Sequence, residues 1–280
     1  MLGIVLLAIG ITGFGLGAYW DLKTTEFPDW LPYSIILLAL GTRGIFSFMT
    51  GDWMILGNSL LIGTIFLGIG LLLYFLRQWG DGDAWLLGAL GFLLPSRLEF
   101  GAETVLPFPL ALLFNFLVVS LAYLIAYSVF LGLKHRSVNG KYVEHLKKEK
   151  YKIAAMVAFF FAFSWAFLFI MQSMAINPVN PASIAQLAFL PFMLTFVLLF
   201  SYYAKVVEKH VFKKRIKTSD LREGDVAVDG KWKGLTRKEI AAIRKKSKYV
   251  WVKEGVRFAP VFVITLLISI FLGDIIFIII

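Results

Sequence analysis

The sequence predicts an all-α polytopic membrane protein with about eight transmembrane helices, one of them short, and a small cytoplasmic α/β insert before the last helix. Composition is the first observation: 59% of the 280 residues are hydrophobic and 16% are charged, and the mean hydropathy is +0.79. A soluble domain has a smaller apolar share. Second, apolar runs of the roughly 20 residues needed to cross a bilayer recur along the chain. Third, most of the 28 Lys and Arg residues lie in two segments, 134–152 and 205–257.

Eight apolar runs give the expected helices. They lie at about 2–20, 30–49, 54–78, 84–95, 106–133, 153–175, 183–204 and 258–280. The first run lacks a positive N-terminal region and leads directly into Asp21, so we expect it to be a membrane helix and not a cleavable signal peptide. The fourth run is the short one: as a helix it is about 16 Å long, against about 30 Å of hydrocarbon. It is predicted to be a short crossing with irregular ends, or a re-entrant piece that lines a cavity.

The distribution of positive charge predicts the topology. Positively charged loops stay in the cytoplasm. If all eight helices cross and the N-terminus is outside, the cytoplasmic segments are 21–29, 79–83, 134–152 and 205–257. With Arg77 counted at the helix boundary beside 79–83, only Arg43 and Arg97 remain outside. Without the fourth crossing, both basic segments would move to the outer face. The short helix is therefore predicted to cross, and Asp21 and Asp83 then lie at the same, cytoplasmic membrane face.

The segment 205–257 is long enough for a small cytoplasmic subdomain. Thr236-Arg237-Lys238-Glu239 fits a capping box, in which the Thr oxygen and the Glu carboxylate satisfy free amides at the start of a helix. We expect that helix to continue to about Lys248 and a short strand to follow at 249–252. The glycines of 224–234 do not have the spacing of a phosphate-binding loop.

Composition also limits the cofactors and partners. The chain has no cysteine, which excludes disulfides and thiolate zinc sites. The three histidines, His135, His145 and His210, are scattered in basic segments, so we expect no metal site and no cofactor. The net charge of +10 is explained by topology and attraction to anionic lipid headgroups, so we expect the lipid bilayer and no nucleic acid as a partner.

The stretch Gly80-Asp81-Gly82-Asp83 places two carboxylates between two apolar runs. One interpretation makes Asp83 the N-cap of the short helix, with the glycines as turn formers, and makes Asp21 an interfacial residue at a helix end. The other is catalytic: an aspartic protease uses two carboxylates around one water, one as base and one as hydrogen-bond donor to the scissile carbonyl. Flanking glycines would let the backbone approach an extended peptide, and a water-accessible cavity would be required.

These residues resemble a known family. Gly80-Asp81-Gly82-Asp83 is similar to the G-x-G-D motif of intramembrane aspartic proteases, and Asp21-Leu22-Lys23 followed by Phe27-Pro28-Asp29-Trp30 resembles a segment of type IV prepilin and archaeal preflagellin peptidases. The resemblance to this family extends to three further places, which are Asn58-Ser59, the stretch 107–115 and the segment 221–260. The resemblance implies cleavage of leader peptides from precursor archaellins or pilin-like proteins with class III-type signal peptides. By position, Asp21 and Asp83 match the catalytic pair.

The resemblance also implies a domain organisation and supporting residues. Residues 1–133 would form the GxGD protease membrane core, followed by a basic cytoplasmic loop (134–152), an additional helix pair (153–204), the basic subdomain (205–257) and a C-terminal transmembrane helix (258–280). Gly80 and Gly82 would support the motif. Candidates for substrate or structural support are Lys23, Pro28, Asp29, Asn58 and Asp81. Asp81 occupies the variable position of the motif, and Asp274 is expected to be a helix-end feature at the opposite membrane face.

Two other functions fit the same residues less well. A presenilin or signal-peptide-peptidase relative would carry Tyr-Asp before G-x-G-D and Pro-Ala-Leu after it, whereas this chain has Trp20-Asp21 and no Pro-Ala-Leu. A proton-coupled transporter could relay protons through paired carboxylates, but would favour internal repeats, and the sequence has no convincing repeat.

Helices six and seven exceed the six-helix plan of some members of the prepilin and preflagellin peptidase family.

Overall fold

In a computed structural model, the protein is described for residues 1–280 except 77, 175–180, 222–224, 229–234, 254 and 276–280. The chain divides into two compact units, one made of Met1–Leu124 with Glu254–Ile280 and the other of Ile125–Lys253. Within the described residues, five helices are long and apolar enough to cross a membrane: Leu2–Thr24, Trp30–Thr50, Met54–Phe75, Phe108–Lys134 and Pro191–Phe212. The expected multi-pass α-helical membrane protein is therefore confirmed, while the number of eight crossings stays a prediction.

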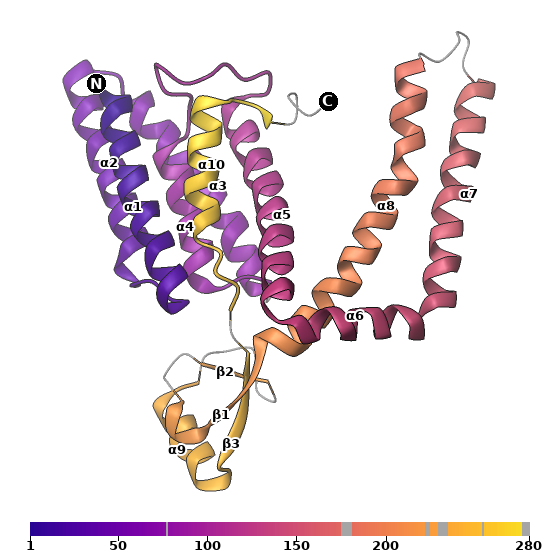
Figure 1. Cartoon of the computed structure of the whole chain (residues 1–280). Helices are drawn as coiled ribbons and strands as arrows, with labels where there is room; N and C mark the ends of the chain where they lie inside the picture. The colour runs from indigo at the N-terminus through magenta and orange to yellow at the C-terminus, as the bar shows by residue number, and fades with distance from the viewer. Residues whose placement is uncertain (77, 175–180, 222–224, 229–234, 254, 276–280) are drawn as a thin grey trace. The chain divides into compact units, whose positions relative to one another are not determined.

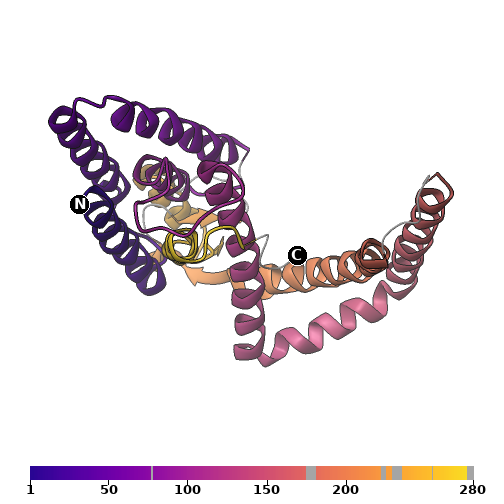
Figure 2. The ribbon, with the colours of Figure 1, turned by 90° about the horizontal axis from the view of Figure 1, so that it is seen from above.

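The first unit contains the helices nearest to the predicted catalytic residues (Figure 1). They are α1 (Leu2–Thr24), α2 (Trp30–Thr50), α3 (Met54–Phe75), α4 (Asp81–Leu93), the first part of α5 (Phe108–Lys134) and α10 (Pro260–Phe271). The third helix thus ends three residues earlier than expected, and the short fourth helix begins at Asp81 instead of residue 84. Helix α10 packs against α1 and α4, as the view from above shows (Figure 2).

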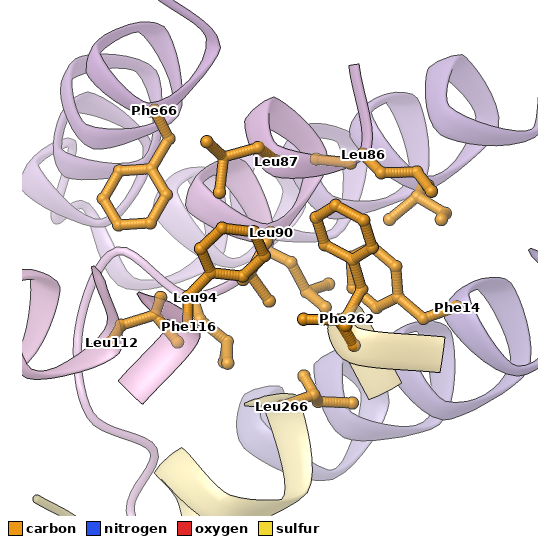
Figure 3. Packing of buried hydrophobic residues seen from close by; sticks show 14 of the residues in the cluster. Phe14, Phe66, Leu86, Leu87, Leu90, Leu94, Leu112, Phe116, Phe262 and Leu266 are labelled. Carbon is orange, nitrogen blue, oxygen red and sulfur yellow. The ribbon is translucent and has the colours of Figure 1, made fainter. Parts of the chain in front are cut away.

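Helix α4 lies in the middle of the first unit. Its residues from Leu86 to Leu93 are all buried, and it packs against α1, α2, α3 and α10. Figure 3 shows Leu86, Leu87 and Leu90 among side chains from the surrounding helices, including Phe14 and Phe262. A helix that is apolar on every side is stable only when other helices cover it, which explains why this segment has no polar face.

Small residues let α3 and α4 approach closely. A Cβ added at Gly70 would lie 2.6 Å from the carbonyl oxygen of Ala84, and one at Gly63 would lie 2.2 Å from the Phe92 ring. Neither position accepts a side chain without movement of its neighbours. Gly63 and Gly70 thus permit the close contact between the two helices. Gly68 does not take part in it, because no atom lies within 4 Å of its Cβ position.

The glycines of α1 also permit close packing. A Cβ at Gly10 would lie 2.7 Å from the Leu93 side chain, and a Cβ at Gly13 would lie 2.5 Å from the Ile35 side chain. Close helix contact through glycine is a general device of membrane proteins. It fixes α1 against α2 and α4, the helices that flank the predicted site.

Two side chains cap the C-terminal end of α4. The last carbonyl groups of a helix have no partner within the helix. Arg43 Nη2 donates to the Leu93 carbonyl at 3.0 Å, and Ser59 Oγ donates to the Phe92 carbonyl at 2.6 Å. Arg43 is only 3% exposed: it lies within α2, as the expected helix at 30–49 placed it, and it caps α4.

The last helix is shorter than the expected span of 258–280. Helix α10 ends at Phe271, and Gly273 then adopts a φ of 72°, in the region that favours glycine. Buried Asp274 turns back to accept hydrogen bonds from the amides of Val105 and Leu106. The carboxylate is therefore a helix-end feature, as expected, and residues 276–280 lie outside the described part.

The second unit contains a helix where a basic loop was expected. Residues of the predicted loop 134–152 form α6 (Arg136–Lys148), because Val138 and Tyr142 lie one turn apart and both pack against α8 (Pro181–Val207). The Tyr142 hydroxyl donates to the Leu199 carbonyl at 3.2 Å. Helices α7 (Lys150–Met174) and α8 pack together, where the additional helix pair was expected.

A small sheet follows α8 in the same unit. After η1 (Glu208–Phe212), strands β1 (Lys213–Lys217), β2 (Val226–Ala227) and β3 (Tyr249–Lys253) form an antiparallel sheet of order β1-β3-β2. A short 3-10 turn, η2 (Thr218–Asp220), follows β1, and helix α9 (Arg237–Lys246) precedes β3. The expected capping box is confirmed: the Thr236 side chain accepts from the Glu239 amide, and the Glu239 side chain accepts from the Thr236 amide. The cytoplasmic position of this α/β segment stays a prediction.

Candidate active site

Asp21 lies near the C-terminal end of α1 and is 4% exposed. Its Oδ2 accepts a hydrogen bond from the backbone amide of Ala259 at 2.8 Å. Ala259 is the N-cap of α10, so the carboxylate faces the positive end of that helix. The Arg257 guanidinium also acts on Asp21 electrostatically. A carboxylate buried at a membrane helix end needs such compensation, which an ordinary interfacial residue in water would not need.

Asp83 lies in the first turn of α4 and is half-buried. The N-cap of α4 is Gly80, with extended backbone, and not Asp83, so the interpretation of Asp83 as N-cap is wrong. The backbone amide of Gly80 is a hydrogen-bond partner of the Asp83 carboxylate, and Asp21 is close enough to act on Asp83 electrostatically. The structure therefore brings together the two carboxylates that the sequence singled out.

The two glycines of the motif have different surroundings. A Cβ at Gly82 would lie 2.7 Å from the Phe27 ring, whereas a Cβ at Gly80 would meet only Asp83 Oδ2 at 3.5 Å. Gly82 thus allows Phe27, from the segment between α1 and α2, to pack against the first turn of α4. This contact joins the two sequence segments that contain Asp21 and Asp83.

Aromatic side chains surround the pair. The Trp79 ring lies 5.6 Å from the Phe116 ring and 5.5 Å from the Phe258 ring, so the residue just before the motif packs against α5 and the start of α10. Trp20 and Trp30 form an edge-to-face pair at 6.0 Å. Tryptophan gathers at membrane interfaces, which fits a site at the end of the helix bundle.

Four of the expected supporting residues lie in the segments around the pair. Lys23, in the last turn of α1, is exposed and donates to the Tyr19 hydroxyl at 3.5 Å. The Pro28 carbonyl accepts from Leu31 in the first turn of α2, and Asp29 is the exposed N-cap of that helix. Asp81 is exposed in the first turn of α4. These side chains are accessible to a bound molecule.

Asn58 is not brought to the pair. It lies exposed in the first turns of α3, beside Ser59, which binds the C-terminal end of α4. Asp83 lies at the other end of α4, where Gly70 of α3 contacts Ala84. Asn58 is therefore at the opposite end of the helix pair, and it is the neighbouring Ser59 that makes a buried contact.

The sequence did not indicate the partners of Asp21. Arg257 and Ala259 belong to a stretch that resembled the family, but neither was named as a site residue. No side-chain pattern could have indicated Ala259, because its contribution is a backbone amide. Among the residues that the structure describes, no three or more His, Cys, Asp and Glu side chains gather in an arrangement that could hold a metal ion.

The fold and the site define a multi-pass α-helical membrane protein with two converging carboxylates at the ends of two of its helices. Comparison with known proteins shows which family this part of the chain is similar to. Residues 6–133, which include both carboxylates, match the type IV leader peptidase family. This similarity agrees with the family resemblance of the sequence motifs.

A curated relative supports the assignment. The chain is 26% identical over 143 residues to "Prepilin peptidase EppA" of Methanothermobacter thermautotrophicus. The matched region covers 47% of this chain and 37% of that relative. No solved structure matches the chain.

Proposed function

We propose that this protein is a membrane aspartic endopeptidase that removes the leader peptide from prearchaellin or type IV prepilin-like precursors. The observation that carries the proposal is the convergence of Asp21 and Asp83, from helices α1 and α4, within the segment that matches the leader peptidase family. Neither carboxylate is needed to keep a surface of the protein soluble. Asp21 is buried, and burial of a carboxylate costs free energy. A hydrolytic pair gives a reason for that cost.

The proposed chemistry needs one shared proton and one water. One carboxylate takes a proton from the water while its oxygen attacks the scissile carbonyl carbon, and the other carboxyl group donates its proton to the carbonyl oxygen. The tetrahedral intermediate then collapses: the C–N bond breaks, the leaving amine takes the proton that the first carboxylate removed from the water, and a hydroxyl of the intermediate returns its proton to the second carboxylate. Two carboxylates that interact electrostatically can share one proton, which is the protonation state that the proposed chemistry requires.

The proposed site faces the cytoplasm, and the N-terminus lies outside. This orientation is supported by the basic residues of 134–152 and 205–257, which favour the cytoplasmic side. Asp21 lies in the last turn of α1 and Asp83 in the first turn of α4. The accessible side chains of Lys23 and Asp29 are proposed to contact the substrate leader there.

The direct test uses membranes that contain the protein and a candidate archaellin or pilin precursor. We expect a cleaved product whose new N-terminus is found by sequencing. Asp21→Asn and Asp83→Asn should each abolish cleavage, because an amide cannot take part in the proton transfers. Asp81→Asn is the matched control: it lies in the same helical turn as Asp83 and is exposed, and its variant should retain most of the activity.

Retained cleavage after the change of either Asp21 or Asp83 would refute the assignment of the pair. Complete absence of cleavage by the wild type, with precursors of both classes, would favour the proton-coupled transporter instead. A cut inside the hydrophobic helix of the precursor, and not before it, would favour a protease of the signal-peptide-peptidase type.

A further inference from the structure

The stretch Arg257-Phe258-Ala259, which leads into α10, contacts both carboxylate-bearing segments. Through its backbone, Ala259 donates to Asp21 Oδ2 at 2.8 Å. Through its ring, Phe258 packs against Trp79 at 5.5 Å, the residue that precedes Gly80. One short stretch thus touches the end of α1 on one side and the approach to α4 on the other.

The hydrogen bond from the Ala259 amide to the Asp21 carboxylate is a strong one. A hydrogen bond to an ionised acceptor is about twice as strong as one between neutral groups, and the start of α10 adds the positive end of a helix. Arg257 supplies a positive charge within electrostatic range of the same carboxylate. Its Nε is buried and has no hydrogen-bond partner among the described residues.

Helix α5 holds this stretch in place. The Tyr123 hydroxyl donates to the carbonyl of Arg257 at 2.6 Å. The Phe258 ring lies 6.1 Å from Phe116 of α5 and 6.0 Å from Phe262 of α10, both within the core shown in Figure 3. The backbone of the stretch is therefore fixed by a hydrogen bond on one residue and by ring packing on the next.

We propose that Arg257-Phe258-Ala259 is a positioning segment, which holds the Asp21 carboxylate in its reactive orientation toward Asp83, and that Tyr123 is the residue that anchors this segment. The inference rests on the proposed peptidase function. It assigns to the start of α10 a role in the reaction geometry, although none of these residues belongs to the aspartate motifs. Asp21 is then the carboxylate whose orientation is fixed by backbone and charge, and Asp83 is fixed by its place in the first turn of α4.

The first test removes only the anchoring hydroxyl. Tyr123→Phe keeps the ring and deletes the hydrogen bond to the Arg257 carbonyl. We expect kcat for leader removal to fall roughly 3- to 10-fold, with KM changed less than about twofold, because substrate binding is not altered. Tyr74→Phe, on α3 and exposed, is the matched control and should keep wild-type kcat and KM.

The second test removes the amide that binds Asp21. Ala259 has φ −55°, which a proline ring accepts, so Ala259→Pro deletes the N–H at a φ that suits proline. We expect kcat to fall roughly 10- to 100-fold. Ala259→Gly keeps the N–H and should stay within about threefold of the wild type. Thermal unfolding in detergent monitors the fold of all four variants.

The outcomes separate this inference from the function on which it rests. If the wild type cleaves, Asp21→Asn and Asp83→Asn do not, and folded Tyr123→Phe and Ala259→Pro cleave at the wild-type kcat, the positioning segment is refuted while the peptidase stands. A rise in KM with unchanged kcat would also overturn it, because that result indicates a binding role. A wild type without cleavage overturns the function and this inference together.

Discussion

The contact between Gly70 of α3 and Ala84 of α4 gives a quantitative prediction for Gly70→Ala. The new Cβ would lie 2.6 Å from the Ala84 carbonyl oxygen and 2.9 Å from the Ala84 Cα. Both neighbours are backbone atoms, so no side-chain rotation relieves the overlap. Non-bonded carbon atoms are at their optimum about 3.5–4.0 Å apart, and α4 must therefore move away from α3 by roughly 1 Å.

This movement occurs one residue from Asp83. A misplacement of about 1 Å in a reactive group costs about 100-fold in rate, and we expect a loss of that order in kcat for leader removal. Overpacking costs about 1–3 kcal/mol, and the higher helix propensity of alanine offsets about 1 kcal/mol. The variant should therefore stay folded while its activity falls.

The assay compares two glycines on the same helix. Gly68 has no atom within 4 Å of its Cβ position, so Gly68→Ala gains the same helix propensity without the overlap. Cleavage of a precursor is followed on gels at equal protein levels, and thermal unfolding is measured in detergent. Equal wild-type activity in both variants would refute the argument that the α3–α4 contact positions Asp83. Equal loss in both would show that the effect is not specific to the contact.

Two further predictions concern stability. Arg43→Met should lower the free energy of unfolding by about 1–3 kcal/mol, because the Leu93 carbonyl loses its buried partner. Arg97→Met, at a partly exposed ion pair, is the control and should change it by less than about 1 kcal/mol; equal unfolding midpoints would contradict the capping role. Thr236→Ala should destabilise α9 by about 0.5–2 kcal/mol through loss of the capping box. Faster amide hydrogen exchange in residues 237–246, with unchanged leader cleavage, is the expected result, and unchanged exchange would contradict it.

The sequence was sufficient for the features that depend on local pattern. Apolar length predicted the long helices, and the Thr236–Glu239 spacing predicted the start of α9. The positive charge predicted that Asp21 and Asp83 share one end of the bundle, and their electrostatic contact agrees with this. The catalytic role of the two residues stays a prediction. The first two of these inferences used residues that are neighbours along one helix, whereas the third used the charge distribution of the whole chain.

The remaining features depend on partners that are distant in sequence. Asp21 is held by a backbone amide 238 residues away, and an amide has no side-chain identity that a motif could display. The break after α10 depends on Asp274 reaching the amides of Val105 and Leu106, which no local pattern reveals. In α6, the many basic residues made the segment look like a loop. Its apolar pair, Val138 and Tyr142, indicates a helix only once its packing against α8 is known.

The shortness of α4 determines how the proposed site is built. A 13-residue helix is about 20 Å long and cannot be held in place by matching the bilayer, as a full-length membrane helix is. Side chains hold it instead: Arg43 and Ser59 bind its C-terminal carbonyls, and Phe27 packs on Gly82 at its other end. The position of Asp83 is thus set by contacts inside the protein. Asp21 lies on the full-length helix α1, and the amide of Ala259 at the start of α10 binds its carboxylate, so contacts inside the protein help to place both carboxylates.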